Sequence, residues 1–158
     1  MNREYFSIVL SSELNLAIPL DNMGAVIQIK MTDICTVPGV ANFWYGAINF
    51  KGSLLWVLDT NCYFELGQNN NHISKKLTAV IVKYHKHNNS KKLALVTPKL
   101  NGIIALDSAE LKPAITNERY VWSDCCSGIF EGETESTFIL NFTDLLKQLQ
   151  SRSDLLTV

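Results

Sequence analysis

Residues 37–59 of the chain read V-P-G-V-A-N-F-W-Y-G-A-I-N-F-K-G-S-L-L-W-V-L-D. Ala47–Phe50 is a short apolar run, and Leu54–Leu58 is a second run rich in residues that favour strands. Between them, Lys51 and Gly52 form a turn signal, because glycine accepts the backbone conformations that tight turns require. The stretch therefore predicts two short strands joined by a tight turn.

More short elements are predicted on the N-terminal side of this stretch. Apolar residues alternate on both sides of a Ser-Ser-Glu turn within Phe6–Leu20, which predicts a β-hairpin. Met23–Ile29 predicts an apolar crossover, either a turn of helix or a bent strand. Val37-Pro38-Gly39 predicts a turn, since proline fixes φ and glycine tolerates positive φ. The aromatic cluster Phe43–Tyr45 is interpreted as one helical turn.

The second half of the chain predicts further strands and a closing helix. The expected strands are Thr78–Tyr84, Leu93–Val96, Gly102–Leu106 and Phe138–Leu140. The helix follows from apolar residues at i, i+3, i+4 and i+7, namely Phe142, Leu145, Leu146 and Leu149. We expect a surface connection at Gln68–Lys76, a solvated hairpin loop at His85–Lys92, a loop at Glu110–Arg119 and a frayed tail beyond Ser151.

The two halves of the chain share a short internal repeat. Gly46 precedes Asp59 by thirteen residues, and Gly128 precedes Asn141 by thirteen, at an offset of 82. Short strands separated by turn signals are typical of small barrels. The sequence therefore predicts one domain, residues 1–158, made of two similar β-lobes. Lobe one is expected at about 1–67 and lobe two at about 77–150, with strands able to cross between them.

Composition limits the classes of function. Of 158 residues, 47% are apolar and 18% are charged, below the ~25% that is usual. The net charge of -1 provides no overall field that attracts nucleic acid or anionic lipid. No apolar run approaches the ~18 residues of a membrane span, and the N-terminus lacks the features of a signal peptide. We therefore expect a cytoplasmic protein with no direct membrane insertion.

No catalytic, metal-binding or cofactor-binding motif is present in the sequence. G-x-S-x-G, G-x-x-x-x-G-K-[ST], G-x-G-x-x-G and C-x-x-C are all absent. The pair His85 and His87 lies in a loop without acidic or cysteine partners, so we interpret both as solvated. The cysteines Cys35, Cys62, Cys125 and Cys126 are expected to be reduced. A small enzyme using His85 or Cys125 between the lobes is the rival that these residues leave open.

The segment Lys83–Lys92 is the strongest candidate for nucleic-acid binding. It contains four lysines and two histidines, but Tyr84 is its only stacking ring. Single-strand binders interleave several aromatic residues with basic ones. We therefore prefer a charged hairpin tip that keeps the protein soluble, and retain a small nucleic-acid-binding β-barrel as the alternative function.

The motifs V-P-G, G-A-I-N-F-K-G and the strand ending in V-L-D appear in the order typical of the CheW family of chemotaxis adaptors, which the chain resembles. That resemblance implies a mostly β fold of two small five-stranded SH3-like barrels sharing an apolar core, with a short C-terminal helix. It also implies a non-enzymatic adaptor without cofactors or metal. The implied partners are a CheA-type histidine kinase and the tip of a methyl-accepting chemoreceptor or photoreceptor, with recruitment to receptor arrays at the inner membrane.

The resemblance also implies a set of partner-binding residues. Asn49, Lys51 and Gly52 match the family's turn, whose Arg is implicated in partner binding, so Lys51 is the first candidate. The complete set of expected partner-binding residues is Met23, Ile27, Gly46, Asn49, Lys51 and Gly52.

Several positions depart from the family pattern. Lys51 keeps the charge of the usual Arg but lacks its bidentate fork. Ala25 stands where Glu is frequent, Thr97-Pro98 where Asp is common, and Asn141 where the closing strand usually has Asp. These departures suggest a divergent member that serves phototaxis or type IV pilus motility.

Overall fold

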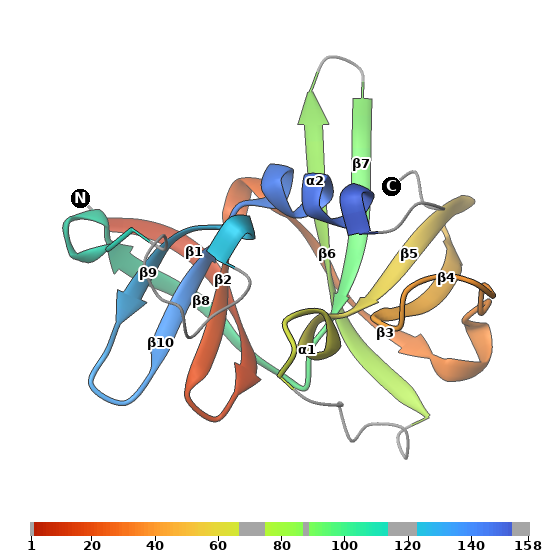
Figure 1. Cartoon of the computed structure of the whole chain (residues 1–158), viewed down its shortest axis with the longest axis horizontal. Coiled ribbons are helices and arrows are strands. Elements are labelled where there is room, and N and C mark those ends of the chain that lie inside the picture. The colour runs from red at the N-terminus through yellow and green to blue at the C-terminus, as the bar shows by residue number, and fades with distance from the viewer. Residues whose placement is uncertain (1, 67–74, 87–88, 114–122, 153–158) are drawn as a thin grey trace.

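The computed structural model describes residues 2–66, 75–86, 89–113 and 123–152, and contains ten strands and two helices (Figure 1). The strands are β1 (Asn2–Ser11), β2 (Leu14–Pro19), β3 (Met23–Lys30), β4 (Trp44–Phe50), β5 (Ser53–Asp59), β6 (Lys76–Lys86), β7 (Asn89–Val96), β8 (Lys99–Asp107), β9 (Cys126–Glu131) and β10 (Ser136–Leu140). The helices are α1 (Thr60–Tyr63) and α2 (Phe142–Arg152).

The ten strands form two five-stranded sheets, which confirms the predicted fold class. The first sheet has the order β8-β1-β2-β10-β9, and the second has the order β3-β6-β7-β5-β4. The second sheet is built from the continuous segment β3–β7, whereas the first combines the N-terminal hairpin with β8–β10. Strands on the N-terminal side of residues 67–77 therefore take part in both sheets. The N-terminal hairpin joins the C-terminal strands because β2 pairs in parallel with β10.

The two sheets share one arrangement of strands. Each has an antiparallel hairpin, β1–β2 or β6–β7, followed in space by a parallel strand, β10 or β5, and then an antiparallel edge strand. Val57 pairs with Ala94 in one sheet, and Ile139 pairs with Ala17 in the other. Val57 and Ile139 are 82 positions apart, which is the offset of the internal repeat in the sequence. The lobes are thus topologically alike, except that the hairpin precedes its partner strands in one and follows them in the other.

One apolar core serves both sheets, as predicted. Strand β6 is buried on both faces, so Val80 and Val82 join the shared core while Ala79 and Ile81 fill the second barrel. The shared core includes Phe6, Ile8, Leu10, Leu14, Leu16, Ile18, Leu58, Val80, Val82, Leu93, Leu95, Phe138, Leu140 and the predicted apolar face of α2, Phe142, Leu145, Leu146 and Leu149. Helix α2 follows the first sheet but contacts β6 of the second, which joins the two lobes.

One local prediction needs correction, and one open alternative is decided. Phe43–Tyr45 forms no helical turn, because Trp44 and Tyr45 begin β4. The Asp59 N–H donates to the Phe43 carbonyl at 2.8 Å and so extends the ladder between β4 and β5 past Trp44. Of the two alternatives for Met23–Ile29, the structure has the strand, with a register irregularity between Met23 and Val26.

The expected loop at His85–Lys92 is also corrected. Strand β6 continues to Lys86 and β7 begins at Asn89, so most of these basic residues lie on paired strands. Lys83 pairs with Lys92 and His85 with Ser90. Hairpin pairing satisfies the backbone polar groups, which outweighs the polar composition that suggested a loop.

Three other predictions fall partly outside the described residues. Residues 68–74 of the expected surface connection, 114–119 of the expected loop and the tail from 153 onward are not described. Within the described part, Lys112 forms an isolated bridge with Ile129. No helix among the described residues is long and apolar enough to cross a membrane.

Thr97 connects the two sheets and provides a test of their coupling. Its buried hydroxyl lies 2.8 Å from the Val9 carbonyl of β1 and 3.1 Å from the Lys99 carbonyl. We expect Thr97→Val to lower the free energy of unfolding by about 1–2 kcal/mol, because the Val9 carbonyl loses a donor in a partly buried place. Urea denaturation measures this loss. Thr97→Ser keeps the hydroxyl and should lose less; equal losses in both variants would contradict the role of the hydrogen bond.

Candidate functional site

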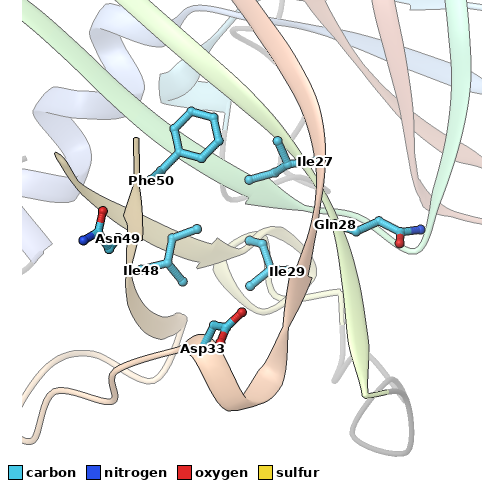
Figure 2. A pocket seen from close by; sticks show the side chains of 7 residues that line it. All are labelled: Ile27, Gln28, Ile29, Asp33, Ile48, Asn49 and Phe50. Atoms are coloured by element: carbon cyan, nitrogen blue, oxygen red, sulfur yellow. The ribbon is translucent and has the colours of Figure 1, made fainter. Parts of the chain in front are cut away.

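A half-open groove of about 540 Å³ lies between the edge strands β3 and β4 (Figure 2). Ile27 lies across from Phe50, and Ile29 lies across from Ile48. These four side chains all contact the apolar cluster inside the second barrel. The groove is therefore the uncovered side of a barrel interior. Its full lining is Ile27, Gln28, Ile29, Asp33, Ile48, Asn49 and Phe50.

The barrel is closed at one end of this groove only. After β3 the chain continues through a 3-10 turn, Met31–Asp33, and then bridges to β4. The Cys35 N–H donates to the Ala47 carbonyl at 2.8 Å, and the Ala47 N–H donates to the Cys35 carbonyl at 3.0 Å. Beyond this bridge, β3 and β4 are the two outer strands of the sheet. Outer strands present backbone groups that can pair with another chain.

The groove has opposite charges near its two ends. The Asp33 carboxylate lies at the closed end, below Ile29 and Ile48 (Figure 2). At the open end, the Lys51 ammonium lies 5.3 Å from the centre of the Phe50 ring. An ammonium over an aromatic face is held by a weak electrostatic attraction. A segment bound in the groove would therefore meet opposite charges at its two ends, which favours one orientation.

The turn at Lys51-Gly52 is well defined, as the sequence predicts. Phe50 pairs with Ser53, so the loop has two residues, and Lys51 and Gly52 have φ values of 51° and 81°. Positive φ at both central residues is typical of hairpin turns whose twist matches the flanking strands. The Gly52 N–H donates to the Asn49 side-chain oxygen at 3.0 Å. The turn thus holds Lys51 exposed at the rim of the groove.

Gly46 shapes the wall of the barrel and is itself buried. Its φ is 138°, and a Cβ at this position would lie 2.2 Å from the Cys35 carbonyl oxygen. Only a residue without a side chain at position 46 lets the Cys35 backbone approach β4 closely enough to bridge to Ala47. The contribution of Gly46 to the groove is therefore the placement of β4.

The six expected partner-binding residues are not all brought together. Ile27 and Asn49 line the groove, and Lys51 and Gly52 form its rim. Met23 lies at the start of β3, partly buried against the shared core, and is not among the groove-lining residues.

Sequence reasoning missed five residues of the groove, which are Gln28, Ile29, Asp33, Ile48 and Phe50. The alternation of Ile27 with Ile29 and of Ile48 with Phe50 was available as a signal. That alternation shows which side chains share a face, but it does not show that β3 and β4 face each other across an opening.

The rival sites gain no support from geometry. Among the described residues, no group of three His, Cys, Asp or Glu side chains is placed to hold a metal ion. A hydrogen bond with Cys125, together with burial, raises the pKa of Cys126, so its thiol stays protonated and unreactive. Burial and the nearby Asp59 carboxylate raise the pKa of Tyr45, which remains neutral. His85 is exposed on β6, and His87 lies outside the described residues.

A comparison with protein families matches residues 4–150 to the CheW-like domain. The chain belongs to the CheW-like family. Among solved structures, it is similar to the scaffolding protein TtCheW from Thermoanaerobacter tengcongensis, with a TM-score of 0.70 and 17% identity over 89% of each chain. This likeness supports the CheW-like fold. A search of curated proteins returned no match.

One departure from the CheW pattern keeps its structural role. Asn141 is the position where the resemblance led us to expect Asp, and its side-chain oxygen accepts a hydrogen bond from the Asp144 N–H at 3.1 Å. Asp59 caps α1 in the same way, accepting from the Cys62 N–H at 3.2 Å. Asn and Asp are both preferred at helix N-caps, so the substitution preserves the start of α2.

Proposed function

We propose that this CheW-like protein is a non-enzymatic adaptor that couples methyl-accepting receptors to a CheA-type histidine kinase. The observation that carries the proposal is the groove between β3 and β4, an apolar opening with Lys51 at one end and Asp33 at the other. Apolar grooves with a few placed polar groups are typical binding sites. Partner side chains would enter between Ile27 and Phe50, and the charges at the ends would set the direction of the bound segment.

The similarity of the two lobes supports a bridging role. Val26 of β3 pairs with Val80, and Ile103 of β8 pairs with Phe6. Both are exposed, at 42% and 64%, on outer strands beside the shared core. Each lobe therefore presents an apolar side chain at the same place on its edge strand. Two such faces on one rigid core suit a protein that holds two partners at a constant separation.

The mechanism that we propose is geometric. Each contact is of modest size, and an array of such contacts gains strength because further contacts become intramolecular. A change of receptor state shifts the active population of the kinase only if contacts differ between the two states. The adaptor contributes the fixed spacing through which this difference is transmitted.

We further propose that the protein works in the cytoplasm at receptor arrays beside the inner membrane, in a phototaxis or type IV pilus system. The support is the divergence at Lys51, Ala25 and Asn141 from the family pattern. Deletion in the native host should abolish directed movement along a light gradient or on a surface. Intact directed movement on surfaces, combined with lost swimming chemotaxis, would assign a flagellar system instead.

Lys51→Glu tests the adaptor proposal. We expect the affinity for the host's CheA-type kinase to fall by at least about tenfold, because reversed charge at the groove rim replaces attraction with repulsion. Isothermal titration measures the affinity, and circular dichroism reports the fold. The parent and the variant carry similar backbone strain at position 51, because a φ of 51° is unfavourable for both Lys and Glu.

Two control variants sharpen this experiment. Lys51→Arg should bind at least as well as the parent, because the guanidinium adds a bidentate fork. Lys147→Glu makes the same charge change at an exposed position of α2, outside the groove and β8, and should bind like the parent. Unchanged binding by Lys51→Glu would remove Lys51 from the site. Failure of the parent protein to bind the kinase would overturn the adaptor proposal.

A further inference from the structure

The outer part of the β6–β7 hairpin extends beyond the second sheet (Figure 1). Strand β3 pairs with β6 only as far as the pair Met23 and Val82. Strand β5 pairs with β7 only from Val57 and Ala94 onward. From Lys83 onward along β6, and before Ala94 on β7, the two strands therefore pair only with each other.

One face of this hairpin changes from buried to exposed along its length. Ile81 and Ala94 are paired, and both are buried inside the second barrel. Side chains alternate along a strand, so the next residues on that face are Lys83 and Lys92, which are paired and both exposed. His85 follows on the same face and is also exposed. The face that is apolar inside the barrel is thus cationic outside it.

This cationic face opposes the stability of the hairpin. Like charges directly opposite each other on neighbouring strands repel, and Lys83 and Lys92 are such a pair. The surrounding sequence contributes no compensating carboxylate, since residues 66–106 contain seven lysines and no Asp or Glu. The chain has fourteen basic and fifteen acidic residues, so the remainder holds seven against fifteen, a net charge of -8. Positive charge is therefore concentrated in the part of the sequence that contains this hairpin.

We propose that the exposed face formed by Lys83, His85 and Lys92, here called the cationic face, docks an acidic segment of a partner protein. This surface goes beyond the proposed function, because none of its residues lines the groove between β3 and β4. Charge complementarity supplies both attraction and steering toward a carboxylate-rich segment. A bound segment would also relieve the repulsion between Lys83 and Lys92.

The residues of the cationic face favour a protein as its binding partner over nucleic acid or a membrane surface. Tyr84, the only aromatic residue on the hairpin, is half-buried on the opposite face and packs against the shared core, so it is not available for base stacking. Membrane-surface binding is strengthened by apolar side chains that enter the lipid. In the described part of the chain, the large apolar residues that are exposed are Val26, Met31, Leu54 and Ile103, and none lies on the hairpin.

The test compares three polyanions on the full chain. Fluorescein-labelled poly-glutamate, a thymidine oligonucleotide matched in charge, and phosphatidylglycerol vesicles are titrated at constant ionic strength. The double variant Lys83→Glu/Lys92→Glu reverses the cationic face but keeps the number of charged side chains, so solubility is maintained. The double variant Lys75→Glu/Lys99→Glu makes the same change of charge at exposed positions away from that face.

We expect poly-glutamate to bind the parent, and the affinity to fall by at least about tenfold in Lys83→Glu/Lys92→Glu with little change in the control. Equal losses in both double variants would overturn the proposal, because overall charge would then explain the binding. Tighter binding of the oligonucleotide or the vesicles through Lys83 and Lys92 would also overturn it and assign the other class of partner. Absence of any poly-glutamate binding to the parent would overturn it as well.

Discussion

Gly46→Ala is expected to lower the free energy of unfolding by about 4 kcal/mol, one of the largest effects of a single added methyl group in this protein. Two costs combine at this position. The φ of 138° is unfavourable for any residue with a side chain, and the new Cβ would lie 2.2 Å from the Cys35 carbonyl oxygen. The atom in the way belongs to the backbone, so relief requires breaking the bridge between Cys35 and Ala47.

Two other glycines provide matched controls for this variant. Gly52 has a φ of 81° with no atom within 4 Å of an added Cβ, so Gly52→Ala carries strain without a clash and should cost about 1 kcal/mol. At Gly128, the position equivalent to Gly46 in the other lobe, an added Cβ would lie 3.1 Å from the Lys112 carbonyl oxygen. Urea denaturation should show the largest loss of unfolding free energy for Gly46→Ala, and smaller losses for Gly128→Ala and Gly52→Ala. A loss at Gly46 no larger than at Gly52 would show that the close approach is absent.

Phe138→Ala is expected to destabilise both lobes together, by about 3–5 kcal/mol. Phe138 belongs to β10 of the first sheet, is 1% exposed and lies in the shared core. Truncation leaves a cavity against side chains from both sheets. Since the core is continuous, the second lobe cannot keep its packing after the first lobe has unfolded.

Two probes that report different lobes measure this coupling. In a Trp122→Phe background, tryptophan emission comes only from Trp44 and Trp56, both in the second sheet. We expect Phe138→Ala to shift this emission transition and the far-ultraviolet circular dichroism transition equally. An emission transition that stays in place would mean that the lobes unfold independently, and that the shared core contributes little to their coupling.

A shared core has a consequence for the adaptor role. The groove between β3 and β4 and the edge strand β8 belong to different sheets, yet both sheets pack on the same cluster of side chains. Close-packed interiors transmit strain and do not deform gradually. The spacing between the two proposed docking faces is therefore set by the core, as the proposed adaptor mechanism requires.

Local signals in the sequence were sufficient for several features. The Lys51-Gly52 turn, the N-terminal hairpin and the apolar face of α2 all follow from residues close together in the chain. Each rests on a short-range cause, namely glycine tolerance of positive φ, alternation along a strand, or the 3.6-residue period of a helix. The order of motifs from Val37 to Asp59 was likewise enough to recognise the CheW-like family.

Tertiary structure alone decided how these elements are assembled. β2 pairs with β10 across about 120 residues, and no local pattern specifies a parallel partner so distant. β6 is apolar on both faces, so its sequence could not show which face enters the shared core and which fills a barrel. The groove exists because β3 and β4 are outer strands that do not pair with each other, and only the segment after β3 bridges to β4, through Cys35 and Ala47. A sequence determines which side chains share a face, whereas long-range pairing determines which faces stay uncovered, and function depends on the uncovered ones.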